Sequence, residues 1–419
     1  MSAVLDDVIA AAQWVPLSHA VEVNPKLDRS SLSDDMDVSF VPMAAVEALS
    51  GGIDVSNIRR YADVKKGYTH FRDGDILFAK VTPCMENGKM AIARKLVNGV
   101  GFGSTEFHVL RPRAGVDARY IYYFVSSQTF RKEAAGHMTG AVGLRRVPSA
   151  YIEDQLIPLP GIERQCEIVA ELEKQFSRLD EAIANLKRVK ANLKRYKASV
   201  LKDAVEGRLV VEMTSDTWKH ARIGEVAQVI SGLTKSPKRV ALPDKFPYLR
   251  VANVYANELR LDSIETIGVA GKELEKLLLR RGDLLVVEGN GSPDQIGRVA
   301  LWDGSIANCV HQNHLIKVRL GSDVLPEWAL VWLLSPSGRR EIEQVSASTS
   351  GLHTLSTGKI SRLPIPVPPL EQQRRIVAEV DRCLSIVREV EAQIDINVKR
   401  SHALRQATLS KAFYLDAKQ

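Results

Sequence analysis

An internal repeat constrains the fold of this chain more than any other feature of its sequence. The segment Pro158-Leu-Pro-Gly-Ile-Glu-Arg-Gln aligns with Pro366-Val-Pro-Pro-Leu-Glu-Gln-Gln, so that Glu371 follows Glu163 by 208 residues. The same offset aligns further segments from about residue 41 to 205, among them Phe71-Arg-Asp-Gly-Asp-Ile-Leu with Leu279-Arg-Arg-Gly-Asp-Leu-Leu, Arg111 with Arg319, and Ile168-Val-Ala-Glu-Leu with Ile376-Val-Ala-Glu-Val. These matches predict a near-gapless duplication, whose copies fold alike and are related by an approximate twofold axis if they pair.

Each copy begins with a part that the sequence predicts to be rich in β-strands. Short apolar runs broken by Gly, Pro, Asn and Asp are typical of strands joined by turns. The runs are Ile76 to Val81, Phe107 to Leu110, Leu284 to Val287 and Leu315 to Val318. Helices are predicted from Arg119 to Gly136 and from Glu327 to Val345.

Each copy ends in a segment that predicts one long helix. Pro and Glu stand where helices begin, in Pro160-Gly-Ile-Glu and in Pro369-Leu-Glu. Apolar residues then recur at steps of three and four, at Val169, Leu172, Phe176, Leu179, Ile183 and Leu186, and again at Val377, Val380, Leu384, Val387 and Ile394. Such a narrow stripe is typical of a coiled coil, and a helix from Glu163 to Val205 would be roughly 65 Å long. The natural partner of each helix is the other copy, packed antiparallel.

Composition and cysteine spacing bound the class of protein. The chain has 419 residues and a formal net charge of +7, a mild basic excess that permits a nucleic-acid partner without requiring one. The four cysteines, at 84, 166, 309 and 383, form no Cys-x-x-Cys pair, so neither a zinc ribbon nor a disulfide framework is predicted. The first residues do not resemble a secretory signal, and no apolar run approaches the ~18 residues of a membrane span. We therefore expect a cytoplasmic protein that does not enter the membrane.

The motifs of both copies resemble those of the specificity subunit of type I restriction-modification enzymes, over essentially the whole chain. The motifs that carry this resemblance are the segment from Gly74-Asp-Ile-Leu to Asn87-Gly-Lys89, its counterpart from Gly282-Asp-Leu-Leu to Gly297-Arg298, the exits Pro158-Leu-Pro and Pro364-Ile-Pro-Val-Pro-Pro followed by Glu and Gln, and the closing Leu404-Arg-Gln-Ala-Thr-Leu-Ser-Lys-Ala-Phe413. The resemblance implies an α+β fold. In it, two β-rich target recognition domains are joined and spaced by two long antiparallel coiled-coil helices with pseudo-twofold symmetry.

The resemblance also implies a domain organisation and a set of partners. We expect target recognition domain 1 at 1–158, helical spacer 1 at 159–212, target recognition domain 2 at 213–366 and helical spacer 2 at 367–419. Each recognition domain would read one half of a split, asymmetric site in double-stranded DNA. Two methyltransferase subunits would dock on the helices, and restriction subunits with a motor would join them. No cofactor is expected in this chain, because S-adenosylmethionine would belong to the methyltransferase subunit, and ATP and Mg to the restriction subunit.

Two polar loops in the first recognition domain, and a set of polar residues in the second, are the candidate DNA-binding sites. Base edges are read by side chains such as Arg, Lys, Asn, Gln and Glu, and phosphates are bound by Lys, Arg or backbone amides. In the first domain these residues are Lys80, Thr82, Asn87, Lys89, Arg145 and Arg146. In the second domain they are Asn290, Ser292, Gln295, Arg298, Gln312, Asn313 and His353. For any single residue the alternative is a solvated loop position, whereas the loops taken as sets favour DNA contact.

The motifs of catalytic and metal sites are missing from the sequence. It contains no Asn/Asp-Pro-Pro-aromatic loop of an amino-methyltransferase, no phosphate loop of an ATP-driven motor and no convincing nuclease constellation. His311 and His314 lie close together, but no third metal ligand follows nearby, so a structural or DNA-facing role is favoured. The basic run from Lys187 to Lys197 is interpreted as the solvated face of the coiled coil in preference to a contact with DNA. We therefore expect a non-catalytic subunit.

Three other interpretations remain open at this point. The first is the recognition subunit of a related type IIB-like system that cuts on both sides of its site. The second is a coiled-coil adaptor that binds proteins and no DNA, against which the polar loops of both copies argue. A free-standing enzyme is disfavoured by the missing motifs.

Overall fold

The computed structural model describes residues 13–28, 30, 32–141, 143–211, 215–289, 295–346 and 354–414. The chain divides into two compact units. Unit 1 comprises Met1–Leu186 with Ile396–Gln419, and unit 2 comprises Lys187–Asp395. Each unit therefore contains one β-rich domain together with part of each long helix, α7 (Ile162–Val205) and α14 (Leu370–Tyr414). Among the described residues, no helix is both long enough and apolar enough to cross a lipid bilayer.

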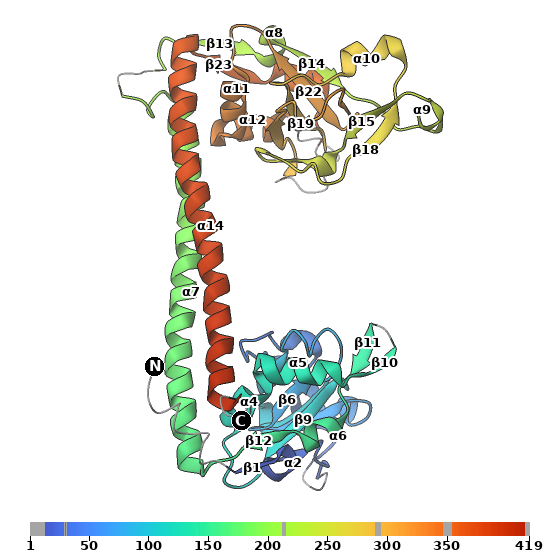
Figure 1. Cartoon of the computed structure of the whole chain (residues 1–419), viewed down its shortest axis with the longest axis vertical. Helices are drawn as coiled ribbons and strands as arrows, with labels where there is room; N and C mark the ends of the chain where they lie inside the picture. Colours follow the sequence, from blue (N-terminus) through green and yellow to red (C-terminus); the bar gives the residue numbers. More distant parts are fainter. Residues whose placement is uncertain are drawn as a thin grey trace. The chain divides into compact units, whose positions relative to one another are not determined.

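Unit 1 is built on two four-stranded sheets (Figure 1). The first sheet is antiparallel and has the order β2 (Val21–Val23), β9 (Phe107–Pro112), β6 (Ile76–Ala79), β7 (Met90–Ile92). The second has the order β4 (Ile58–Arg60), β3 (Asp37–Val41), β8 (Val100–Gly103), β5 (Thr69–Arg72), with β3 and β8 parallel. Two short pairs complete the strands, β1 (Trp14–Pro16) with β12 (Leu156–Pro158) and β10 (Thr139–Ala141) with β11 (Leu144–Arg146). The helices of this domain are α2 (Leu17–Ala20), α3 (Tyr61–Val64), α4 (Ala118–Ser126), α5 (Gln128–Gly136) and α6 (Ser149–Asp154).

Alternation along β6 explains how this domain packs. Successive side chains of a strand point to opposite faces of the sheet. Ile76 and Phe78 lie in one core cluster with residues of α4, α5 and α7, whereas Leu77 and Ala79 lie in another cluster with residues of the second sheet. The strand is therefore buried on both faces, which is why its sequence is a continuous apolar run.

Unit 2 repeats most of this arrangement. Its antiparallel sheet has the order β14 (Ala227–Ser231), β22 (Leu315–Leu320), β19 (Leu284–Val287), β20 (Val299–Leu301). Its second sheet has the order β18 (Glu265–Gly268), β15 (Lys245–Leu249), β21 (Val310–His311). The short pairs are β13 (Lys219–Arg222) with β23 (Pro364–Val367) and β16 (Val254–Tyr255) with β17 (Glu258–Leu259). The helices of this domain are α8 (Ile223–Val226), α9 (Pro237–Ala241), α10 (Gly271–Leu277), α11 (Pro326–Leu334), α12 (Pro336–Ser346) and α13 (Thr357–Arg362).

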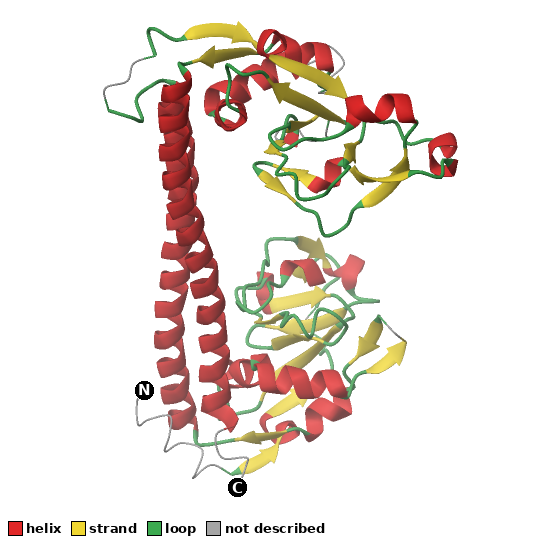
Figure 2. Ribbon diagram, turned by 45° about the horizontal axis from the view of Figure 1, so that its top comes forward, coloured by secondary structure: helices red, strands yellow, loops and turns green. Residues whose placement is uncertain are grey.

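The two long helices pack against each other within each unit (Figure 2). In unit 1 the first turns of α7, with Leu172 and Phe176, share a core with Phe413 near the end of α14. In unit 2 Leu201 near the end of α7 shares a core with Val380 in the first turns of α14. The helices are therefore antiparallel, and the predicted α+β fold, with two β-rich domains and two long helices packed together, is confirmed.

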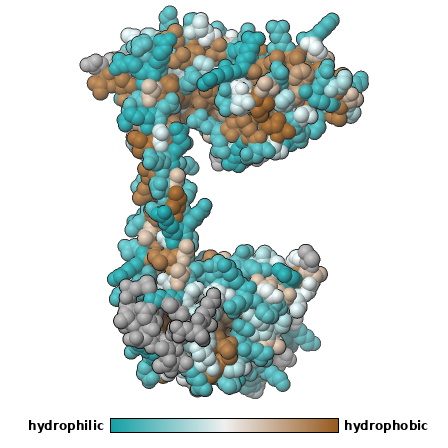
Figure 3. All heavy atoms as spheres, viewed as in Figure 1, coloured by the Kyte–Doolittle hydropathy of each residue, from teal (hydrophilic) through white to brown (hydrophobic). Residues whose placement is uncertain are grey.

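The surface of the long helices is polar, as the narrow apolar stripe predicts. In the view of Figure 3 hydrophilic residues dominate along them, with apolar residues scattered between. Ion pairs link the two helices in both units. Arg405 contacts Asp180 at 2.8 Å in unit 1, and Lys190 contacts Asp395 at 2.6 Å in unit 2.

Each helix that was predicted after the main sheet is in fact two helices. The segment predicted from Arg119 to Gly136 is divided at Ser127, and the segment predicted from Glu327 to Val345 is divided at Ser335. Both serines are in extended conformation. The hydroxyl of Ser127 accepts from the amide of Phe130 at 3.2 Å, and that of Ser335 accepts from the amide of Gly338 at 3.1 Å. Each serine thus caps a new helix, because a serine hydroxyl satisfies an amide that has no partner inside the helix.

The structure preserves the repeat, but the offset of 208 residues does not hold in every segment. Pairs 208 residues apart occupy equivalent places in β6 and β19, in β9 and β22, and in α4 and α11. However, Phe78 pairs with Met90 whereas Val286 pairs with Val299, so the second copy has one more residue between these strands. The second copy therefore departs from the common offset by one residue at this loop, which is one of the loops proposed to read DNA.

Equivalent buried ion pairs stabilise the turn before β6 and the turn before β19. Asp75 and Asp283 are each 1% exposed and are paired with Arg111 and Arg319 at 2.7 Å. The turn before each aspartate needs a glycine, because Gly74 and Gly282 have φ of +90° and +93°. The repeated Gly-Asp motif is therefore a tight turn followed by a buried ion pair.

The exit motif is also explained by buried hydrogen bonds. Gln165 accepts from the amide of Asp117 at 2.9 Å and donates to the carbonyl of Pro160 at 2.8 Å. Gln373 accepts from the amide of Leu325 at 2.8 Å and donates to the carbonyl of Pro368 at 2.7 Å. The last Gln of each exit motif thus ties the start of a long helix to the loop that precedes α4 or α11.

Candidate nucleic-acid interface

The two predicted loops of the first domain meet in the structure. The amide of Thr82, after β6, donates to the carbonyl of Arg145 in β11 at 2.9 Å. The amide of Val147 donates to the carbonyl of Lys80 at 2.9 Å. The β10–β11 hairpin thereby lies beside the loop that begins at Lys80, although the bonded residues Thr82 and Arg145 are 63 positions apart in the sequence.

Glu106 lies at the same place and was not among the predicted residues. The amide of Lys80 donates to its carbonyl at 2.9 Å. Its carboxylate accepts from the guanidinium of Arg146 at 2.9 and 2.7 Å. This hydrogen-bonded pairing holds the pKa of Glu106 below its usual range, so the carboxylate stays ionised. We call Lys80, Glu106 and Arg146 the first corner.

The other predicted residues of the first domain have different environments. Thr82 donates to the carboxylate of Glu86 at 2.8 Å. Asn87 and Arg145 are exposed. The ammonium group of Lys89 donates to the carbonyl of Met43 at 3.0 Å and is half-buried, so this lysine holds the loop in place.

The second domain has an equivalent corner at the same place in its fold. The amide of Glu288 donates to the carbonyl of His314 at 2.9 Å, and the amide of Leu355 donates to the carbonyl of Glu288 at 2.7 Å. Glu288, His314 and Leu355 each lie 208 residues after a residue that makes the same backbone contact in the first domain. The imidazole Nδ1 of His314 lies 2.9 Å from a carboxylate oxygen of Glu288. We call Glu288 and His314 the second corner.

Only some of the predicted residues of the second domain lie at this corner. Asn313 lies beside it, with its amide nitrogen 3.4 Å from Nε2 of His314. The side chain of Gln312 accepts from the amide of Val251 at 3.3 Å, which is a contact inside the domain. Gln295 is exposed, and Arg298 donates to it at 3.4 Å. Asn290, Ser292 and His353 lie outside the residues that the structure describes.

The corners use one backbone arrangement for two different sets of side chains. Lys80 is replaced by Glu288, and Glu106 is replaced by His314. The first corner thus presents cations around a carboxylate, and the second presents a carboxylate beside an imidazole. The signal for Glu106 and His314 was present in the sequence, because each stands one residue before a β-strand run at the common offset.

The histidine pair near the second corner is not a metal site in this fold. His311 is fully buried, and its Nδ1 lies 2.8 Å from the carbonyl of Leu315, whereas His314 is exposed. Among the described residues, no group of three His, Cys, Asp or Glu side chains is placed to hold a metal ion. His311 therefore has the structural role that was one of the two predicted for it.

Burial of His311 should make the second domain sensitive to acid. Burial lowers the pKa of His311 to about 4, and within the described residues its Nε2 has no hydrogen-bond partner. The folded-state pKa is below the ordinary value of 6.5, so between pH 6.5 and 4 the unfolded chain binds more protons. Stability should therefore fall as the pH drops through this window, by about 3 kcal/mol in total.

Urea unfolding at pH 7 and pH 4.5 measures this effect. The control is His311→Gln, which removes the titratable imidazole and keeps a side-chain donor for the carbonyl of Leu315. The variant should lose most of the extra acid sensitivity. An equal loss of stability in the wild type and the variant would contradict this prediction.

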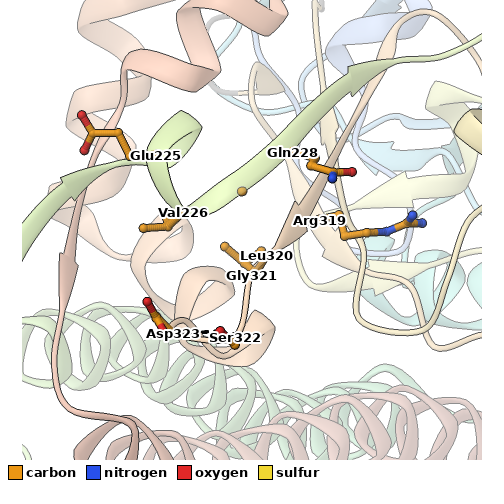
Figure 4. A pocket seen from close by; sticks show the side chains of 9 residues that line it. Glu225, Val226, Gln228, Arg319, Leu320, Gly321, Ser322 and Asp323 are labelled. Carbon is orange, nitrogen blue, oxygen red and sulfur yellow. Dashed lines mark hydrogen bonds between the residues drawn. The ribbon is translucent and has the colours of Figure 1, made fainter.

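A pocket of about 420 Å³ lies elsewhere in the second domain, between the ends of β14 and β22. Figure 4 shows its lining, which includes Gln228, Gly321 and Asp323. Arg113 stands at the position of Gly321 in the first domain, where it donates to the carbonyl of Ser18 at 3.1 Å. The pocket contains none of the predicted DNA-binding residues and reflects the absence of a large side chain at position 321.

Comparison with known proteins places the chain in a family. The type I restriction modification DNA specificity domain matches twice, over residues 21–195 and 215–400. The chain is 39% identical over 170 residues to the type I restriction enzyme EcoAI specificity subunit from Escherichia coli, a match that covers 40% of this chain and 28% of that protein. It is 27% identical over 312 residues to the EcoKI specificity subunit from Escherichia coli K12, covering 73% of this chain and 67% of that protein. The match to the first of these relatives thus spans less than a third of its length.

Solved structures have the same fold. A chain from a structural study of complex assembly in a type I R-M system superposes with a TM-score of 0.77 at 20% identity, covering 96% of this chain and 97% of that chain. The HsdS subunit from Thermoanaerobacter tengcongensis superposes with a TM-score of 0.60 at 20% identity, with the same coverage of 96% and 97%. The doubled family match extends over most of the sequence, and the fold agrees with it. The chain therefore belongs to the type I restriction-modification DNA specificity family.

Proposed function

We propose that this chain is the DNA specificity subunit of a type I restriction-modification system and that each β-rich domain reads one half of a bipartite, asymmetric site. The observation that carries this proposal is the pair of corners. One scaffold presents Lys80, Glu106 and Arg146 in the first domain, and Glu288 and His314 at the same backbone positions in the second. A scaffold that is used twice with different hydrogen-bonding groups suits a target whose halves differ.

The side chains of the two corners favour different base edges. Lysine and arginine donate to O6 and N7 of guanine, whereas a carboxylate accepts from N4 of cytosine. The first corner is thus suited to guanine through Lys80, and the second to cytosine through Glu288. Asn87, Arg145, Gln295 and the neighbouring loops would supply further base and phosphate contacts.

The chain carries no catalytic motif, so the chemistry belongs to its partners. We propose that two methyltransferase subunits with S-adenosylmethionine and the restriction subunits with ATP and Mg assemble with this chain. The assembly would act in the cytoplasm. The chain itself would select the DNA site and bring these subunits to it.

Methylome mapping of cells that carry this chain with its methyltransferase tests the proposal. The expected result is a split, asymmetric motif with methylated adenines. A continuous motif would contradict the proposal. The absence of any motif in cells whose methyltransferase subunit is active would contradict it as well. Cleavage on both sides of the site would assign the chain to a type IIB-like system instead.

The same assay tests the corners with the variant Glu288→Gln. Replacing the carboxylate by an amide changes the acceptor pattern, and a good base contact contributes about 1–3 kcal/mol of discrimination. One base position in one half of the motif should become relaxed by roughly tenfold or more, while the other half stays unchanged. Glu275→Gln, on the exposed face of α10, is the matched control and should leave both halves intact. Relaxation of both halves, or of neither, would rule out a reading role for the second corner.

A further inference from the structure

A cationic pocket in unit 2 lies between the last part of α7 and the second recognition domain. Its volume is about 410 Å³. Four cations line it, Lys194 and Lys197 from α7, and Arg298 and Arg339 from the domain. Leu201, Leu334 and Leu384 form its apolar floor. Among the residues that the structure describes, no carboxylate lines this pocket.

The two lysines of this pocket are available to an anion, whereas Arg339 donates to the carbonyls of Ile296 and Gly297 at 2.7 and 3.2 Å. Within the described part of the chain, neither ammonium group of Lys194 and Lys197 is paired with a carboxylate. The guanidinium of Arg298 lies 4.9 Å from the centre of the Tyr255 ring, and its Nε has no hydrogen-bond partner among the described residues. Arg260 covers the same ring at 3.8 Å and is paired with Glu258 at 2.9 Å.

The equivalent place in unit 1 is neutralised by its own side chains. Arg405 lies 208 residues after Lys197, and it is paired with Asp180 at 2.8 Å and stacked on Phe176 at 4.4 Å. In the second copy, Leu384 and Arg388 stand where Phe176 and Asp180 stand in the first. The cation of α7 in unit 2 therefore lacks the carboxylate that its counterpart has.

We propose that this pocket binds a phosphate of the DNA backbone next to the bases that the second domain reads. The inference rests on the proposed function and adds to it a contact from the spacer helix. Arg298 lines the pocket together with Lys194 and Lys197 and directly precedes β20, so a DNA strand bound beside Arg298 would lie close to both lysines. Lysines on a helix bind the phosphates of DNA through charge and independently of sequence. The basic run of α7, interpreted from the sequence as a solvated face, thus has a binding role at these two positions.

The test measures binding of the full chain to a mixed-sequence duplex of about 40 base pairs at several salt concentrations. Each phosphate contact contributes about 0.9 to the slope of log K against log salt. The double variant Lys194→Gln/Lys197→Gln should lower this slope by about one to two and weaken binding most at low salt. The matched control is Lys187→Gln/Lys202→Gln, which removes the same charge from exposed positions of the same helix outside the pocket.

The outcomes separate this inference from the proposed function. An unchanged slope in the pocket variant, with normal methylation of the split motif, would overturn the phosphate site and leave the function standing. Equal losses in the pocket variant and the control would also overturn it, because they would show a general effect of charge. Saturable binding of inorganic phosphate or AMP without DNA, lost in the pocket variant, would assign the pocket to a small anion instead. A wild-type chain that binds no duplex with its methyltransferase present would contradict the proposed function itself.

Discussion

Replacing Arg319 by methionine should lower the unfolding free energy of the second recognition domain by about 3–5 kcal/mol. Asp283 is 1% exposed and accepts from Nε and Nη2 of Arg319, both at 2.7 Å. Its carboxylate also accepts from the amide of Arg280 at 2.7 Å. Without the guanidinium, a buried carboxylate remains with too few partners, and desolvation of an unpaired charge is costly.

Tryptophan fluorescence in a urea titration measures this loss. Four of the five tryptophans lie in unit 2, at positions 218, 302, 328 and 332, so the signal reports mainly on that unit. The neighbouring Arg281 is exposed, and Arg281→Met should change the stability by no more than about 0.5 kcal/mol. Adding Asp283→Asn to Arg319→Met should restore part of the stability, because the buried charge is then removed. A cost below about 1 kcal/mol for Arg319→Met would show that the ion pair is not needed.

Replacing Gln373 by leucine should cost about 4 kcal/mol, because three hydrogen bonds are lost in a fully buried place. Gln373 accepts from the amide of Leu325 at 2.8 Å. It donates to the carbonyls of Asp323 at 2.9 Å and Pro368 at 2.7 Å. Each buried group that is left without a partner costs about 1–3 kcal/mol, and leucine fills the space without replacing any bond.

Hydrogen exchange locates the consequence of this change. The amide of Leu325 should lose its protection, because its only acceptor is the side chain of Gln373 in the described structure. The control is Arg374→Leu, which alters the next residue of α14 on its exposed side and should leave the Leu325 amide protected. Protection that survives in Gln373→Leu would mean that other groups hold the loop before α11 to the helix.

The corresponding glutamine in unit 1 allows an independent check. Gln165 bonds to Asp117, Gly115 and Pro160 in the pattern that Gln373 repeats 208 residues later. Gln165→Leu should therefore destabilise unit 1 by a similar amount and leave the tryptophan signal of unit 2 largely unchanged.

Much of the fold could be predicted from the sequence, because it depends on local periodicity. The apolar runs that became β6, β9, β19 and β22 lie next to turn residues, and the stripe along α7 and α14 keeps helical spacing over many turns. The sequence did not predict the capping serines at 127 and 335. A serine inside an apolar helical pattern is compatible with a continuous helix, and only the structure shows that its hydroxyl accepts from an amide of the next helix.

The candidate site could be predicted less well from the sequence, because its residues come from segments that are far apart in the chain. Lys80 and Lys89 are chemically alike and share one loop, yet only Lys80 lies at the first corner. The ammonium group of Lys89 donates to the carbonyl of Met43, and no feature near Lys89 in the sequence indicates that contact. The place of Glu106 one residue before a strand run is visible in the sequence, but its pairing with Arg146, forty residues away, is not.

The sequence by itself determined that this chain carries one recognition unit twice, each with a long helix, because a repeat and an apolar stripe are visible in the order of residues alone. Only the tertiary structure decided which polar side chains bond to the protein's own carbonyls and carboxylates, as Lys89 does, and which stay exposed, as Asn87 and Arg145 do. Lys194 and Lys197 of α7 illustrate the difference. Their helical spacing suggests only a solvated face, but in the fold they line one cationic pocket together with Arg298 and Arg339. The physical reason is that charge acts through space, so its effect depends on neighbours that the order of residues does not specify.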